Sequence, residues 1–98
     1  MIARLTGQIV EQKTNELIID IQGVGYLVTV SMRTLNQVQK TTGNISLFIE
    51  TIVREDSITL YGFYTQDEKT AFNLLQAVQG VGAKAALSLL STLSPEDL

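Results

Sequence analysis

The residues best suited to bind a ligand form a short segment near the C-terminal end of the sequence. Gly80-Val81-Gly82-Ala83-Lys84 directly precedes an alanine- and leucine-rich run with helical spacing. The first amides of a helix lack partners within that helix, and the helix dipole adds partial positive charge beside them. The glycines permit close approach to the amides of Val81 to Lys84, and Lys84 adds a full charge. These features predict a phosphate-binding site that is indifferent to nucleotide sequence.

The same glycine pattern also fits a simpler structure. A glycine can end one helix and lead into the next without any ligand, and such turns are commoner than anion sites. The spacing differs from that of a P-loop, and a dinucleotide fingerprint needs a third glycine and a preceding strand. Gly23-Val24-Gly25 repeats the letters between two predicted strands, where a turn is favoured. From the residues alone, 80–84 can be either a simple turn between helices or a phosphate-binding site.

Two adjacent carboxylates form the second candidate site. Glu55 and Asp56 lie between two predicted strands, so we expect them to be exposed at a turn. They would repel nearby phosphates, and Arg54 is the nearest compensating charge. An ordinary polar turn is the commoner explanation of such a pair. A magnesium site for nuclease chemistry is a third, but no further acidic cluster or general base accompanies the pair, so no metal site is predicted.

The remaining basic and aromatic residues are weaker candidates. Four scattered basic residues can contact phosphates but are more typical of solvated surface: Arg4, Lys13, Arg33 and Lys40. Tyr26 and Tyr61 can stack on bases, although their place in alternating strands favours core packing. Three aromatic residues are expected in the core or between barrel and helices: Phe48, Phe63 and Phe72.

The composition limits the chemistry that is available. The chain has 98 residues, 45% of them apolar, which suits one small domain or a small barrel with a helical piece attached. It contains no Cys and no His, so disulfides, thiolate nucleophiles, the usual zinc sites and histidine bases are absent. We therefore expect no catalysis and no cofactor. The net charge of −3 counts against a nucleic-acid binder, but local patches and backbone donors can override it.

The chain shows neither an apolar run long enough for a membrane span nor the apolar region of a signal peptide. A soluble cytoplasmic protein is expected, with no membrane partner.

The first 63 residues read as strands with turn signals between them. We expect five strands: Leu5–Val10, Leu17–Ile21, Tyr26–Val30, Ile45–Val53 and Ile58–Phe63. Five short strands suggest a small closed barrel of the OB type. Met32–Thr42 is polar and remains ambiguous.

Helical signals begin after Tyr64. Thr65 is the expected N-cap, and Glu68 has capping-box spacing from it. An apolar face is predicted on this helix from Phe72, Leu75 and Val78, with Ala71 and Leu74 beside them. Gln79–Gly82 ends it, and a second helix is expected over Ala83–Leu93, with Ala86, Leu87 and Leu90 at helical spacing. Ser94-Pro95-Glu96-Asp97 then reads as the start of another helix, so we expect the chain to be cut from a longer one.

The segment from Leu74 to Ser91, with the glycine pattern at its centre, resembles a helix-hairpin-helix DNA-binding motif. Four further stretches occur in register with the RuvA family of bacterial Holliday-junction-binding subunits: Met1–Gly7, Gly23–Tyr26, Val53–Asp56 and Leu60–Phe63. The whole chain is therefore similar to this family. One departure is Ala83, where many relatives carry proline.

The resemblance implies a five-stranded OB-type barrel followed by a helix-hairpin-helix segment. Residues 1–63 would form the barrel domain, and residues 64–98 an incomplete helical domain with the first such motif. The second motif and the C-terminal motor-binding domain would be absent. The resemblance also implies an acidic pin at Glu55 and Asp56, near the centre of a four-fold assembly, where the carboxylates repel DNA phosphates.

The implied function is non-catalytic binding of four-way junction DNA in branch migration, during recombination, repair of DNA damage and the SOS response. The implied partners are a RuvB-type ATPase motor, a RuvC-type resolvase and further copies of the chain, as a homotetramer or paired tetramers. The alternative is an oligomerisation module with negligible DNA binding. It is favoured by the absent second motif and by the helical half, where two basic residues stand against four acidic ones. An enzyme is the third and weakest hypothesis.

Overall fold

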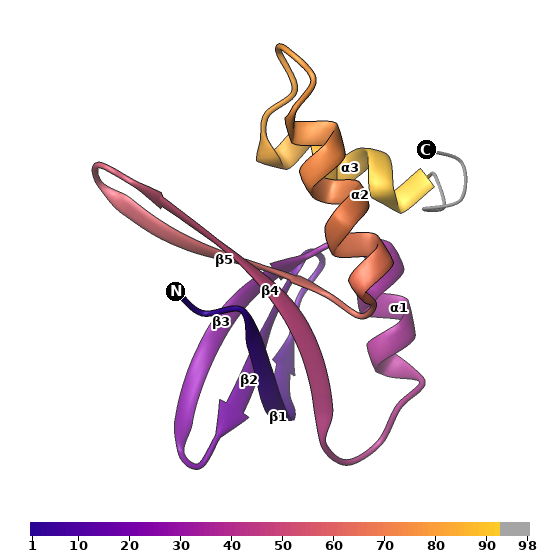
Figure 1. Cartoon of the computed structure of the whole chain (residues 1–98). Helices are drawn as coiled ribbons and strands as arrows, with labels where there is room; N and C mark the ends of the chain where they lie inside the picture. Colours follow the sequence, from indigo (N-terminus) through magenta and orange to yellow (C-terminus); the bar gives the residue numbers. More distant parts are fainter. Residues whose placement is uncertain (93–98) are drawn as a thin grey trace.

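Alternating apolar and polar residues in the first part of the chain form a closed β-barrel. The computed structural model describes residues 1–92, and Figure 1 shows their arrangement. Five strands make the barrel: β1 (Arg4–Gln12), β2 (Glu16–Ile21), β3 (Val24–Val30), β4 (Ile45–Arg54) and β5 (Ser57–Phe63). They close in the order β1-β2-β3-β5-β4, and only the pair β3 with β5 is parallel. The expected OB-type barrel is confirmed, with slightly longer strands.

The barrel core follows from the period-two alternation of the strands. Leu17 and Ile19 of β2 and Leu47 and Ile49 of β4 are at most 1% exposed. Fully burying a side chain of this size stabilises a fold by about 1.5–3 kcal/mol. The β2–β3 connection keeps this register with a two-residue turn at Gln22 and Gly23, whose φ angles are +51° and +91°.

The segment that the sequence left ambiguous is a helix, α1 (Met32–Gln39). Ser31 caps it, because its side-chain oxygen accepts a hydrogen bond from the Thr34 amide at 3.1 Å. Leu35 and Val38 are buried in the barrel cluster. The helix was hard to recognise because only these two apolar positions, among polar residues, mark its inner face.

Two further helices pack on the end of β5: α2 (Gln66–Gln76) and α3 (Ala83–Thr92), called here the helical pair. The Phe72 ring lies 4.9 Å from the Phe63 ring and 5.3 Å from that of Tyr61, which joins α2 to β5. The α3 residues predicted at helical spacing are buried in the same cluster: Ala86, Leu87 and Leu90. Over residues 1–92, none of the helices has the length and apolar content that a membrane crossing requires.

Two details of the helical pair differ from the prediction or lie beyond it. Val78 follows the end of α2 and is 55% exposed, and Leu74 is 60% exposed, so neither belongs to the buried face. That face consists of Ala71, Phe72 and the partly buried Leu75, because these three point at β5 and α3. The predicted end of the second helix at Leu93 and the helix start at Ser94–Asp97 lie outside the described residues.

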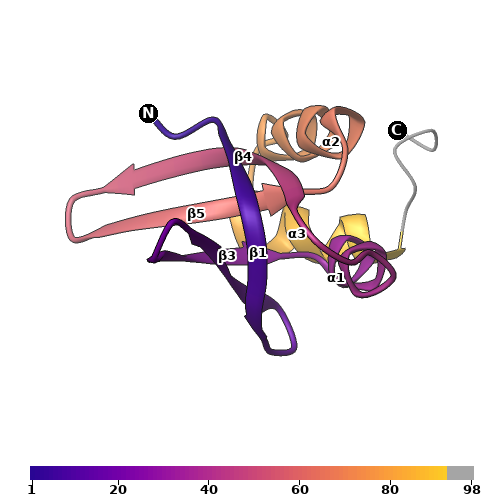
Figure 2. The ribbon, with the colours of Figure 1, turned by 90° about the horizontal axis from the view of Figure 1, so that it is seen from below.

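Strands β4 and β5 continue beyond the barrel as a two-stranded projection, called here the arm (residues 52–60). β1 pairs with β4 over Ile45–Phe48, and β3 pairs with β5 at Tyr61 and Gly62. Within the arm, β4 and β5 pair with each other without a register shift up to Arg54 and Ser57. Figure 2 shows the arm projecting on one side, with the three helices gathered at the other.

Candidate nucleic-acid interface

The connection between α2 and α3 is built from short backbone turns. The Ala77 amide donates to the Asn73 and Leu74 carbonyls, both at 3.2 Å, and the Val78 amide donates to Leu75 at 3.1 Å. Gly80 then reverses the chain with φ +86°, a conformation in which a side chain would be strained. This connection, residues 77–84, is called the glycine hairpin.

Val81 anchors the glycine hairpin. Its side chain is half-buried and packs against the cluster between the helical pair and β5. Its amide differs from the prediction, because it donates to the Val78 carbonyl at 3.1 Å and is already paired. The hairpin is therefore held by its own backbone and by the apolar side chains of Val81 and Ala83.

Free amides begin one residue later. The first helical bond of α3 runs from the Ala86 amide to the Gly82 carbonyl at 3.0 Å. The amides of Gly82, Ala83, Lys84 and Ala85 have no hydrogen-bond partner among residues 1–92. A Cβ added at Gly82 would meet nothing within 4 Å, so the space on the Cβ side of Gly82 is open. Such amides at a helix start can donate hydrogen bonds to an anionic oxygen.

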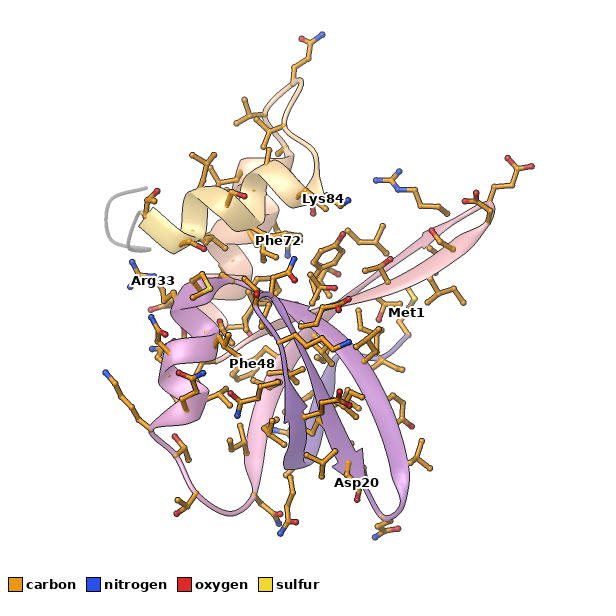
Figure 3. The ribbon with its side chains drawn as sticks, turned by 180° about the vertical axis from the view of Figure 1, so that it is seen from behind. Met1, Asp20, Arg33, Phe48, Phe72 and Lys84 are labelled. Atoms are coloured by element: carbon orange, nitrogen blue, oxygen red, sulfur yellow. The ribbon has the colours of Figure 1, made fainter. Side chains whose placement is uncertain are left out.

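Lys84 is exposed in the first turn of α3. Figure 3 shows it on the side of α3 toward which the arm projects. It lines a groove of about 630 Å³ between α3 and the barrel. The groove also contains residues from the β1–β2 turn, β3, β5 and α3, among them Asn15, Leu27, Ile58 and Ser88. The structure thus brings Lys84 beside the unpaired amides.

The acidic pair lies at the far end of the arm. Glu55 and Asp56 form the turn between β4 and β5, and both are exposed. Figure 1 shows this turn and the glycine hairpin as two separate projections of the molecule. Within residues 1–92, no group of three or more His, Cys, Asp or Glu side chains could hold a metal ion. Arg54 is exposed just before the turn, and by alternation it shares the face of Ile52, which packs toward the helical pair.

The other basic candidates divide into two groups. Arg4, Lys13 and Lys40 are exposed on the barrel or at its loops. Arg33 is not solvated surface as expected: it is partly buried, and its Nε donates to the Leu90 carbonyl at 3.0 Å. The difference arises because Arg33 belongs to a helix that packs against α3.

The aromatic candidates lie where core packing predicted them. Tyr61 is 7% exposed beside Phe72, and Tyr26 is partly buried against the barrel cluster. Phe63 and Phe72 are completely buried, and the partly buried Phe48 packs on the same cluster. The rings of Tyr61, Phe63 and Phe72 are therefore too buried to stack on a base.

A buried carboxylate was missed by the sequence reasoning. Glu68 is 1% exposed although it lies in the first turn of α2. Its amide donates to Thr65 Oγ1 at 3.2 Å, as the capping-box spacing predicted. Its carboxylate accepts hydrogen bonds from Thr65 Oγ1 at 3.2 Å and from Thr34 Oγ1 at 3.1 Å. Burial raises the pKa of Glu68 above 4.5, although the bonds from Thr34 and Thr65 and the charge of Arg33 act to lower it.

Comparison with known proteins now decides the family. A family profile described as "RuvA N terminal domain" matches residues 1–62. The chain belongs to the RuvA N-terminal domain family.

Full-length relatives agree with this assignment. The chain is 51% identical to a protein of Zymomonas mobilis over 94 residues, which are 96% of the chain and 44% of that relative. It is 52% identical to a protein of Rickettsia felis and 53% identical to one of Brucella canis, each over 100% of the chain and 48% of the relative. All three are named "Holliday junction branch migration complex subunit RuvA". The chain spans about half the length of these relatives.

Proposed function

We propose that the chain binds four-way DNA junctions as a non-catalytic part of a branch-migration complex in recombination and repair. The observation that carries this proposal is the row of unpaired amides from Gly82 to Ala85 beside the exposed Lys84. Partial positive charge at the start of α3 and a full charge on Lys84 attract a phosphate group. Contacts of this kind do not read bases, so binding depends on the shape of the DNA and not on its sequence.

The phosphate site of this proposal comprises Gly80, Val81, Gly82, Ala83 and Lys84. The two glycines give access and shape, Val81 holds the hairpin on the helical pair, and the amides after it donate. This division of roles explains why Val81 is half-buried while Gly80, Gly82 and Lys84 are open to solvent.

Glu55 and Asp56 have the opposite role. Two exposed carboxylates at the end of an arm repel phosphates, and they keep DNA strands apart at the crossover. Arg54 supports the turn by offsetting part of its charge. Their distance from the glycine hairpin supports this division, because attraction and repulsion act on different parts of one junction.

The names of the relatives and the exposed apolar side chains support an assembly. Several large apolar residues are well exposed: Val10, Val24, Leu27, Val53 and Ile58. The partners of this proposal are further copies of the chain, as a homotetramer or paired tetramers, together with a RuvB-type ATPase motor and a RuvC-type resolvase. All of them act in the cytoplasm. In this proposal, residues 1–63 are the barrel domain and residues 64–98 belong to a helical domain. The same exposed residues also favour the alternative, an oligomerisation module with negligible DNA binding.

Binding of the 98-residue chain to a four-way junction and to duplex of equal length, over a range of salt concentrations, tests the proposal. We expect tighter binding to the junction. Lys84→Glu should weaken that binding and lower its salt dependence by about one phosphate contact. Lys40→Glu makes the same charge change at an exposed position away from the glycine hairpin and should have a much smaller effect. Equal affinity for both DNAs would contradict the proposal, and binding to neither would favour the oligomerisation module.

A further inference from the structure

The first turn of α1 is joined to both helices of the helical pair. Three consecutive residues make these contacts: the Met32 amide donates to Ser91 Oγ at 3.2 Å, Arg33 Nε to the Leu90 carbonyl at 3.0 Å, and Thr34 Oγ1 to Glu68 Oε2 at 3.1 Å. Figure 3 shows Arg33 at the end of α3 opposite to Lys84. The contacts with α3 therefore lie at the opposite end of that helix from the proposed phosphate site.

The contacts with α3 pair complementary helix ends. The N-terminal amides of α1 need acceptors, and one of them is supplied by Ser91 of α3. The Leu90 carbonyl near the end of α3 accepts a hydrogen bond from the Arg33 guanidinium, whose positive charge suits the C-terminal end of a helix. Each helix thus supplies one hydrogen-bond partner to the other, and both lose that partner if α3 moves.

The contact with α2 is centred on Glu68. Each carboxylate oxygen accepts a hydrogen bond from a hydroxyl group, one from Thr65 just before α2 and the other from Thr34 of α1. An unpaired acceptor at this buried position would cost free energy, so the bonds strongly favour one placement of α2 against α1. Apolar contact through the Phe72 ring is less directional, because it tolerates small shifts that a hydrogen bond does not.

We propose that the first turn of α1, acting through Glu68, Leu90 and Ser91, is a positioning contact that fixes the orientation of the helical pair relative to the barrel and its arm. On the function proposed above, it also fixes where the glycine hairpin lies relative to the acidic turn. Thr34 and Arg33 are then positioning residues that touch no DNA, and they determine whether a junction can meet both regions at once.

The orientation is measurable without DNA. The sequence contains no cysteine, so Gln8→Cys and Asn73→Cys place two spin labels at exposed positions of β1 and α2. Pulsed electron paramagnetic resonance then gives the distance distribution between barrel and helical pair. In this background, Thr34→Val removes the hydroxyl that donates to Glu68, and Thr34→Ser keeps one. We expect Thr34→Val to broaden or shift the distribution and Thr34→Ser to leave it unchanged.

A contact that only adds stability would lower the thermal unfolding midpoint in Thr34→Val without changing the distance distribution, and that result would overturn the inference. If Thr34→Val does not fold, Arg33→Met removes the Nε donor to Leu90 and keeps the apolar stem, and it should broaden the same distribution. An unchanged distribution in Arg33→Met would overturn the inference equally.

Junction binding separates this inference from the proposed function. We expect Thr34→Val to lose several-fold in its preference for junction over duplex, with Thr34→Ser retaining the preference. If Thr34→Val broadens the distance distribution but keeps its full preference for the junction, this contact does not determine junction binding. That result would overturn the positioning role in DNA binding and leave the proposed function intact. If Lys84→Glu in the original chain leaves junction binding unchanged, the proposed function is removed, whatever the spin labels report.

Discussion

The glycine hairpin and the acidic turn are both short connections between two paired elements, but they present different parts of the chain. The glycine hairpin presents backbone amides, from Gly82 onward, and one lysine. The acidic turn presents two side-chain carboxylates, Glu55 and Asp56. A site made of backbone is sensitive to conformation and tolerant of many side chains. A site made of side chains is removed by substituting them, while the fold around it remains.

The largest effect should come from Gly80, because it determines the shape of the backbone site. Gly80→Ala forces a side chain into φ +86°, which costs about 1–2 kcal/mol. We expect the free energy of unfolding in urea to fall by about that amount and junction binding to weaken strongly. Gly82→Ala is the matched control for stability, because a Cβ there meets nothing within 4 Å and no positive φ is required. An equal loss of stability in both variants would show that the positive φ of Gly80 does not cause the effect.

A smaller effect of opposite sign is expected at the acidic turn. Glu55→Gln with Asp56→Asn removes two negative charges from an exposed turn and leaves its shape. Because repulsion from phosphates is lost, junction binding should tighten, most clearly at low salt. Stability should hardly change. Titration of labelled junction at two salt concentrations measures the effect, and weaker binding would argue against repulsion as the role of this turn.

The smallest effect separates buried from exposed carboxylates. Glu68 has a raised pKa, so the folded chain binds its proton more tightly than the unfolded chain does. Its contribution to the free energy of unfolding is therefore largest below the ordinary value of 4.5 and falls as pH rises through the folded pKa. Urea unfolding across this range should show the dependence in the original chain and a flatter one in Glu68→Gln. Parallel curves would contradict the assignment of the dependence to Glu68.

Patterns of neighbouring residues in the sequence predicted the strands of the barrel and the start of α2. Alternation predicted the five strands, and the spacing of Thr65 and Glu68 predicted the start of α2. Helix α1 was left ambiguous because Leu35 and Val38 are its only large core residues. The burial of Glu68 was missed for the same reason, since its second hydroxyl partner, Thr34, lies on that helix.

The candidate sites show a similar limit. Sequence placed the glycine pattern between two helices and the acidic pair at a turn, because both depend on neighbouring residues. Sequence did not reveal that the Val81 amide donates to the Val78 carbonyl, because that bond depends on the geometry of the turn. Nor did it reveal that Arg33 donates to the Leu90 carbonyl. Contacts between residues far apart in the chain depend on the packing of whole elements, which no short pattern records.

The unbroken pairing of β4 with β5 makes the arm a spacer of defined length. Seven consecutive cross-strand pairs run from Phe48 and Phe63 to Arg54 and Ser57. At about 3.4 Å per residue, Ser57 lies about 20 Å along β5 from Phe63. Because side chains alternate, only insertions of two residues in each strand would lengthen this spacer and keep Arg54 on its present face. The reach of the acidic tip can therefore change only in steps of about 7 Å.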